Sequence, residues 1–246
     1  MEHLPVLKLC TFEVMTPLGR CRRLGVALDG RVMDLNFATA WYMEQTGEAE
    51  AQRFADGIVP DNMLDFLRFG LRASHTAEDL FHGAGPRPPD WWKLDDPPRG
   101  INGETLVYRA GEVRILAPLE GRGIAGPEEE ICWQPDSRIG LAGVIGAGGA
   151  IAGYTIHSGP ALGPVIVPAG RIKNPDDLGV NVRVNGEMRA GPASRTRGAG
   201  WLKPAPPLPG DIVRDGIECP GLKAGDVIEV EIAEIGTLRN RIAAVS

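Results

Sequence analysis

The C-terminal stretch of the chain decides its fold. Residues 221–241 read GLKAGDVIEVEIAEIGTLRNR. Apolar and charged residues alternate over 227–232, and this period of two is typical of a β-strand with one buried face and one wet face. The same alternation occurs over 178–184, and the Asn185-Gly186 pair that follows is typical of a type I′ hairpin turn. We therefore predict that this part of the chain is built from strands and tight turns.

The sequence upstream of this stretch has the same β-like character. Residues 113–117 are rich in strand formers, and residues 141–145 are nearly all apolar, as in a strand buried on both faces. The glycine-rich run 146–150 follows. If this run is a dinucleotide-binding G-x-G-x-x-G motif, Ile151 takes the place of the third small residue and a strand follows instead of a helix. A glycine-rich hairpin is therefore the better interpretation.

The first third of the chain, residues 1–83, reads as a small α/β unit. Strand formers dominate its beginning, and Asp29-Gly30 is a hairpin signal between two further strand-like runs. The period then changes, and a helical apolar face begins at Phe37. A second helix is predicted after Asp61, with this residue as its N-cap.

A proline-rich segment, residues 84–104, separates this unit from the β-like part, residues 105–246. Prolines this dense deny backbone donors to a sheet, so the segment is predicted to be a linker or an external loop. Trp91 and Trp92 within it are expected to pack onto a surface, with a ligand-stacking role as the alternative.

Length and composition limit the classes of function. The chain has 246 residues, a net charge of −6 and no long Lys/Arg run, which argues against a nucleic-acid partner. No stretch has the roughly 18 to 20 apolar residues of a membrane span, so no membrane partner is expected. The start of the sequence lacks the pattern of a secretion signal, and four scattered cysteines fit a reducing compartment. We expect a cytoplasmic location.

Spacing alone assembles no catalytic constellation, but two features are candidates. His157 is the only histidine in the β-like part, and it lies at the end of a predicted strand. A structural histidine is the simpler interpretation, and a general base is the alternative because imidazole titrates near neutral pH. The run 128–130 is three adjacent glutamates, expected to be a solvated loop, with a cation site as the alternative.

Several landmarks, in their order along the chain, resemble the fumarylacetoacetate hydrolase superfamily. They are the closing run 221–241, the strand and turn 181–187, the Pro-Gly-Asp segment 208–213, and the two strands 144–146 and 152–156. The resemblance spans nearly the whole chain. It implies an α+β, mainly β fold, with a mixed β-roll C-terminal domain and a small α/β N-terminal domain, usually assembled as a homodimer.

The resemblance also implies a chemistry. Enzymes of this family hold Mg²⁺ or Mn²⁺ with carboxylates, and the metal chelates a 2-oxo or 1,3-diketo acid. Hydrolysis, decarboxylation or isomerisation follows, as with acylpyruvates in aromatic catabolism. Hard oxygen ligands suit Mg²⁺, which neutralises the enolate that forms as a C–C bond breaks.

The family's metal-ligand positions can be carried over to this sequence one at a time. The Glu-x-Glu pair falls on Arg138 and Gly140, and the Asp falls on Gly159. The Phe-x-x-His segment that carries the family's catalytic His is missing after Leu119. A guanidinium repels a divalent cation. We therefore predict a shortened member that lacks the usual metal-ligand carboxylates and uses no metal cofactor.

Two functions remain open. In the first, the chain is a degenerate member without the metal-dependent activity. It is then a binding or partner subunit, as a homodimer or as a heteromer with an active paralogue, and takes a small anionic metabolite at Arg138, Tyr154 and Lys173. In the second, it is a metal-independent hydrolase or isomerase of a keto or enol acid. His157 would then act as acid or base, and Arg138 with Lys173 would stabilise an enolate.

Overall fold

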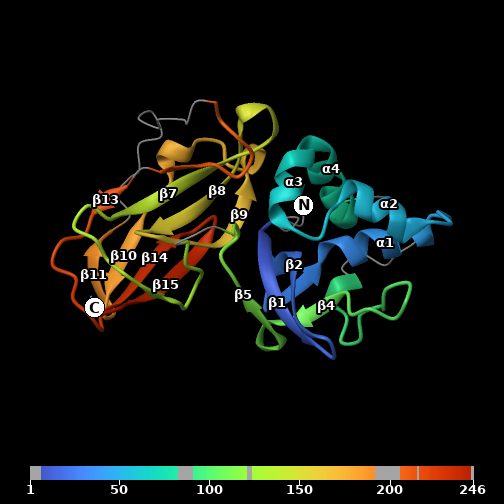
Figure 1. Cartoon of the computed structure of the whole chain (residues 1–246), viewed down its shortest axis with the longest axis horizontal. Coiled ribbons are helices and arrows are strands. Elements are labelled where there is room, and N and C mark those ends of the chain that lie inside the picture. Colours follow the sequence, from blue (N-terminus) through green and yellow to red (C-terminus); the bar gives the residue numbers. More distant parts are fainter. Residues whose placement is uncertain (1–6, 83–90, 121–123, 192–205, 215, 245–246) are drawn as a thin grey trace. The chain divides into compact units, whose positions relative to one another are not determined.

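The computed structural model describes residues 7–82, 91–120, 124–191, 206–214 and 216–244. The chain is an α+β protein, mainly β, and forms two compact units, residues 1–114 and 115–246 (Figure 1). The first unit extends past the boundary predicted at residue 104. The reason is that β4 (Val107–Arg109) pairs antiparallel with β3 (Arg31–Asp34), so this stretch belongs to the N-terminal sheet.

The first unit is built on an antiparallel sheet in which neighbours in sequence are neighbours in space. β1 (Leu9–Thr16) pairs with β2 (Gly19–Leu28), β2 pairs with β3, and β3 pairs with β4. The predicted Asp29-Gly30 hairpin joins β2 to β3, and Gly30 has a φ of +68°. The short strand β5 (Val113–Ile115) follows the 3₁₀ turn η2 (Ala110–Glu112).

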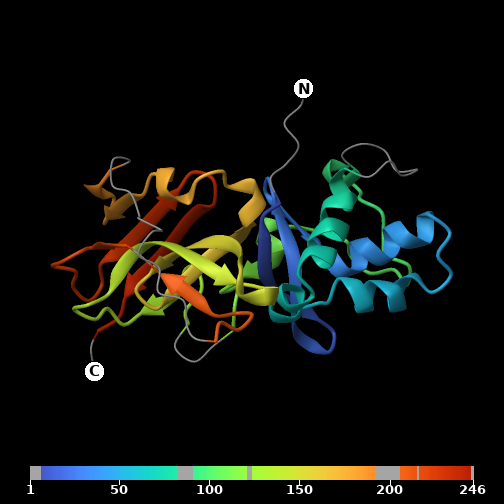
Figure 2. The same ribbon diagram turned by 90° about the horizontal axis from the view of Figure 1, so that it is seen from above.

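Four helices gather on one side of this sheet, as Figures 1 and 2 show together. They are α1 (Leu35–Gln45), α2 (Ala51–Ile58), α3 (Met63–Phe69) and α4 (Leu71–His82). The N-cap of α3 is Asn62, which accepts a hydrogen bond from the Asp65 amide, so the helix predicted after Asp61 begins one residue later than expected. Trp91 and Trp92, in the 3₁₀ turn η1 (Trp91–Lys93), are buried as predicted.

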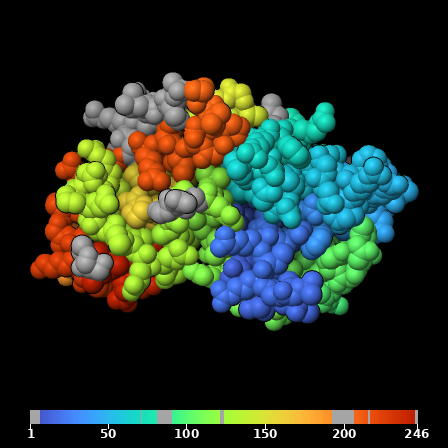
Figure 3. All heavy atoms as spheres, viewed as in Figure 1, coloured from blue at the N-terminus to red at the C-terminus, as the bar shows by residue number. Residues whose placement is uncertain are grey.

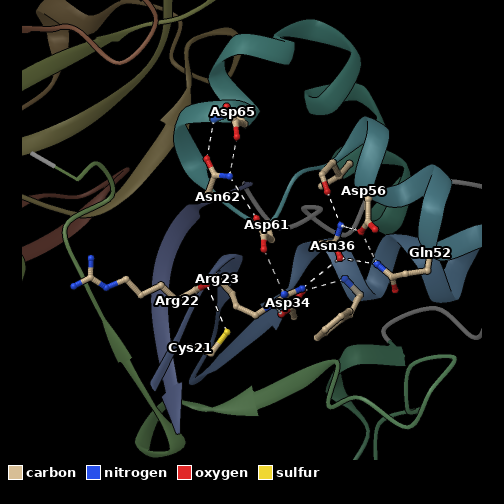
Figure 4. Close-up of polar contacts among 12 residues, drawn as sticks. Cys21, Arg22, Arg23, Asp34, Asn36, Gln52, Asp56, Asp61, Asn62 and Asp65 are labelled. Atoms are coloured by element: carbon tan, nitrogen blue, oxygen red, sulfur yellow. Dashed lines mark hydrogen bonds and ion pairs between the residues drawn. The ribbon is translucent and has the colours of Figure 1, made fainter. Parts of the chain in front are cut away.

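A buried polar network ties these helices to the sheet (Figure 4). The Arg23 guanidinium on β2 forms an ion pair with Asp34, which is fully buried and also caps α1 by accepting from the Phe37 amide. Asn36, the second residue of α1, donates to Asp56 at 3.1 Å and accepts from Gln52 at 2.9 Å. The network therefore links α1 to both β2 and α2.

The second unit contains two packed sheets. In the first sheet, β7 (Arg138–Ile145), β8 (Ile151–Ser158) and β9 (Ala161–Pro168) are antiparallel neighbours. β12 (Ile212–Arg214) and β13 (Ile217–Glu218) pair with the other edge of β7. The 3₁₀ turn η3 (Ala147–Gly149) joins β7 to β8, so the glycine-rich run is the predicted hairpin and opens no nucleotide-binding helix.

The second sheet has the order β11 (Glu187–Ala190), β10 (Asn181–Val184), β14 (Val227–Ile232), β15 (Gly236–Ile242) and β6 (Glu130–Ile131). β6 runs parallel to β15, which makes the sheet mixed. Burial alternates along β14 as predicted, and its buried residues face β8 of the other sheet. Asn185 and Gly186 have φ values of +53° and +83°, which a type I′ turn requires.

The remaining 3₁₀ turns, η4 (Ala169–Arg171) and η5 (Pro175–Asp177), lie between β9 and β10. None of the helices in the described ranges is both long enough and apolar enough to cross a membrane.

Candidate functional site

An open cavity of about 660 Å³ lies within the second unit, where β7 begins and β8 ends. Figure 3 shows this face, where gold atoms of the β8–β9 region lie recessed between yellow-green atoms of the chain before β7 and orange atoms near β12. The charged residues of the cavity lining and its histidine are Glu129, Glu130, Asp136, Arg138, His157 and Arg214.

Gly159, in the two-residue connection between β8 and β9, sits at the centre of the lining. Its amide donates to the Arg138 carbonyl at 2.9 Å, and its carbonyl accepts from Arg214 Nη1 at 3.2 Å. Its φ of +54° is a conformation that residues with a side chain rarely adopt. A Cβ at this position would lie 3.2 Å from Ser137 Oγ and 3.3 Å from the Trp133 ring. The space for a side chain at position 159 is therefore taken by the segment before β7.

Arg138 is the first residue of β7 and lines the cavity. Its guanidinium forms an ion pair with Glu218 at 3.3 Å and donates to the Gly216 carbonyl at 3.3 Å. The side chain is 54% exposed. Exposed ion pairs of this kind contribute little to stability, about 0–1 kcal/mol, so this guanidinium can exchange partners readily.

Arg214, the last residue of β12, is the second guanidinium at the cavity. It reaches this place because β12 pairs with β7, with Arg214 opposite Ala142. Its side chain keeps contact with solvent, yet the surrounding protein atoms lower the pKa of Arg214 through desolvation. The sequence does not predict this residue as part of the site, because no local pattern shows that β12 pairs with β7.

His157 lies one residue before the end of β8, opposite Gly140 of β7 and Leu162 of β9. It is 2% exposed and belongs to the cavity lining. The structure thus brings together two of the predicted site residues, Arg138 and His157.

Three carboxylates also line the cavity. Glu129 accepts a hydrogen bond from the Gly126 amide at 3.0 Å, and Glu130 begins β6. Glu128, by contrast, pairs with Arg239 at 2.7 Å and is not in the lining. The acidic run, expected to be a solvated loop, therefore contributes two members to the cavity wall, and Asp136 adds a third carboxylate.

The other two predicted ligand-binding residues lie elsewhere in the second unit. Tyr154 is near the opposite end of β8, paired with Val167, and burial together with Asp176 raises its pKa. Lys173 is exposed in the chain between η4 and η5. Neither lines the cavity of Arg138 and His157, so their role in binding stays a prediction.

The residues at this cavity do not fit a divalent cation. Arg138, Gly140 and Gly159 supply no carboxylate, and Trp133 crowds the third of these positions. Among the residues that the structure describes, no group of three or more His, Cys, Asp or Glu side chains is arranged to hold a metal ion. Two guanidinium groups in the lining would repel one.

Comparisons with solved structures identify the class of fold. No protein-family model and no curated protein matches the sequence. The structure has the fold of the fumarylacetoacetate hydrolase superfamily, as the resemblance in the sequence implies. Because the identities to these structures are about a fifth or less, they show the fold alone.

The solved structures with a similar fold are those of enzymes with different activities in their names. Maleylpyruvate hydrolase from Sphingobium sp. SYK-6 matches with a TM-score of 0.60 and 16% identity, over 97% of this chain and 100% of that one. A fumarylacetoacetate hydrolase from Exiguobacterium antarcticum matches at 0.53 and 21%, over 96% and 100%. A 2-keto-3-deoxy-D-arabinonate dehydratase, solved with magnesium and 2,5-dioxopentanoate, matches at 0.54 and 19%, over 97% and 99%.

Proposed function

We propose that this chain is a degenerate protein of the fumarylacetoacetate hydrolase fold that binds a small carboxylic acid in the cavity without a divalent cation. The observation that carries the proposal is the set of groups around Gly159. Two guanidinium groups and a histidine line the place where the family's carboxylates are expected, and the Trp133 ring lies 3.3 Å from the position of a Cβ at residue 159. Guanidinium binds carboxylates through paired hydrogen bonds.

The acidic residues of the lining narrow the ligand further. Glu129, Glu130 and Asp136 would repel a ligand with several negative charges, but they can accept hydrogen bonds from a hydroxyl group. A small acid with a hydroxyl or an enol beside its carboxylate satisfies both kinds of group. A role as a partner subunit, in a homodimer or with an active paralogue, belongs to the same proposal.

Calorimetric titration with glycolate, a small 2-hydroxy acid, tests this function. We expect binding that is equal with and without Mg²⁺ or Mn²⁺ and that weakens when Arg138 and Arg214 are both replaced by alanine. The matched control is Arg183→Ala, which removes a surface guanidinium and its 3.1 Å ion pair to Glu231 away from the cavity. Glycolate binding that depends on the metal would contradict the proposal.

A second candidate function is a metal-independent hydrolase or isomerase of a keto or enol acid. It is favoured by one observation, that His157 shares the cavity with Arg138. The histidine would move a proton while a guanidinium stabilises the enolate. Turnover of an acylpyruvate in the presence of a chelator, lost in His157→Ala, would support this reading over a pure binding role.

A further inference from the structure

Arg214 and Arg138 differ in how their charges are compensated. Among the residues that the structure describes, the Arg214 guanidinium has one hydrogen-bond partner, the Gly159 carbonyl, to which Nη1 donates at 3.2 Å. None of the carboxylates in the described part of the chain forms an ion pair with it. Arg138, by contrast, is already paired with Glu218.

This difference in ion pairing decides which guanidinium is available to an anion. A ligand carboxylate that binds Arg138 must displace Glu218 or share the guanidinium with it. A carboxylate that binds Arg214 displaces no carboxylate of the described ranges, and within those ranges four of the five N–H donors of that guanidinium have no acceptor. Arg214 is also partly desolvated, which strengthens its attraction for an anion.

We infer that Arg214 is the fixed cation of this cavity and anchors the carboxylate of a small 2-hydroxy acid or enol acid. The inference rests on the proposed function and names the residue that carries it. Arg214 holds the carbonyl of Gly159, at the position where the resemblance places a metal-ligand aspartate. The positive charge of the Arg214 side chain thus lies beside the position where related proteins are expected to bind a cation.

The exchange of an ion for a guanidinium has a chemical consequence. A guanidinium needs no carboxylate ligands to hold it, so glycine at positions 140 and 159 is compatible with its presence. It offers a planar pair of donors that matches one carboxylate group. It thus favours a single carboxylate over chelation of two oxygens on adjacent carbons, which is the geometry that a metal ion selects.

The experiment compares variants that separate the charge of Arg214 from its structural hydrogen bond. Arg214→Gln keeps a donor for the Gly159 carbonyl but removes the charge. Arg214→Lys keeps the charge but removes the planar pair of N–H donors. Glycolate and its neutral analogue glycolamide are titrated into the full chain by calorimetry. Arg138→Gln and Arg183→Gln serve as the cavity and the surface control. The unfolding midpoint of each variant reports whether it is folded.

We expect Arg214→Gln to raise the Kd of glycolate at least about tenfold, which is about 1.4 kcal/mol. Arg214→Lys should raise it less, Arg138→Gln less than about threefold, and Arg183→Gln not at all. Glycolamide should bind weakly to all variants alike. If wild type binds glycolate and Arg138→Gln loses more affinity than Arg214→Gln, the inference is wrong and the proposed function stands. If wild type does not bind glycolate, the proposed function fails and the inference with it.

Discussion

Cys10 is a fully buried thiol on β1, and its surroundings make its ionisation costly. Burial, and secondarily the negative charge of Asp34, raise the pKa of Cys10 from 9.0 to about 12. A group with a raised pKa in the folded state stabilises the fold below its unfolded pKa, and this contribution is lost as the pH rises towards the folded pKa. We therefore expect the free energy of unfolding to fall between pH 9 and 12, with no more than about 4 kcal/mol due to Cys10. Urea unfolding at a series of pH values measures this slope.

The control for this prediction is Cys132, which is exposed. Cys10→Ala should flatten the alkaline slope, although it lowers stability at every pH by leaving a small cavity. Part of the slope should remain, because burial also raises the pKa of Tyr108 to about 12. Cys132→Ala should keep the wild-type slope. An unchanged slope in Cys10→Ala would show that this thiol does not set the alkaline limit.

At the same scale, the two cavity residues that the sequence predicts have different origins. His157 lies at the end of a predicted strand, and Arg138 falls on a metal-ligand position of the family that the sequence resembles. Arg214 is not predicted, because its place depends on β12 pairing with β7, a long-range contact with no local signature. The acidic run was read as a solvated loop, since sequence neighbours seldom share a site, yet the turn at Glu128 leaves Glu129 and Glu130 at the cavity.

Among the elements, the β1–β2–β3 sheet depends on a glycine in its middle strand. A Cβ added to Gly25 would lie 2.7 Å from the Met33 carbonyl oxygen and 2.9 Å from the Phe12 ring. The backbone oxygen cannot move without breaking the pairing of β2 with β3. We therefore expect Gly25→Ala to lower the free energy of unfolding by about 1–3 kcal/mol, measured by urea denaturation.

Gly57 in α2 provides the matched control, because a Cβ there meets no atom within 4 Å. Gly57→Ala should stabilise the protein by about 0.5–1 kcal/mol, since alanine loses less backbone entropy in a helix. If both substitutions had the same sign, packing at Gly25 would not be what sets the sheet spacing.

The strands were easier to predict than the helices for a physical reason. β14 has one buried and one partly exposed face, so apolar and charged residues alternate in its sequence. α2 has eight residues and no side-chain cap at Glu50, and α4 buries mainly small residues such as Ala73 and Ala77. Small residues on the buried face and the missing cap at Glu50 give the sequence little signal, so neither helix is predicted. Their positions come from packing against α1 rather than from propensity.

Over the whole molecule, the fold is predictable because its landmarks follow one another in the same order as in the family that the sequence resembles. The residue at which the two units divide is not predictable from the sequence. The proline-rich composition of 84–104 predicts a linker. In the structure, however, the ring of Trp91 packs against that of Trp41 in α1, and the two ring centroids are 4.8 Å apart. The energy of burying two tryptophans outweighs the local preference for an exposed loop. The chain then returns to add β4 to the first sheet, which moves the division to residue 114.

Thermal unfolding of the whole chain tests the absence of a metal site in solution. A ligand that binds only the folded state at a hundredfold excess over its Kd stabilises by about 2.7 kcal/mol. For a chain of this length that is a rise of roughly 5–10 °C in the unfolding midpoint. We expect Mg²⁺ and Mn²⁺ to leave the midpoint at the value found in NaCl of equal ionic strength, and glycolate to raise it in the absence of either metal. A rise with Mn²⁺ that a chelator reverses and that Glu129→Gln or Glu130→Gln abolishes would instead show a cation seated on the acidic run. The two guanidinium groups at the cavity make that outcome unfavourable, because they lie in the same lining as both glutamates.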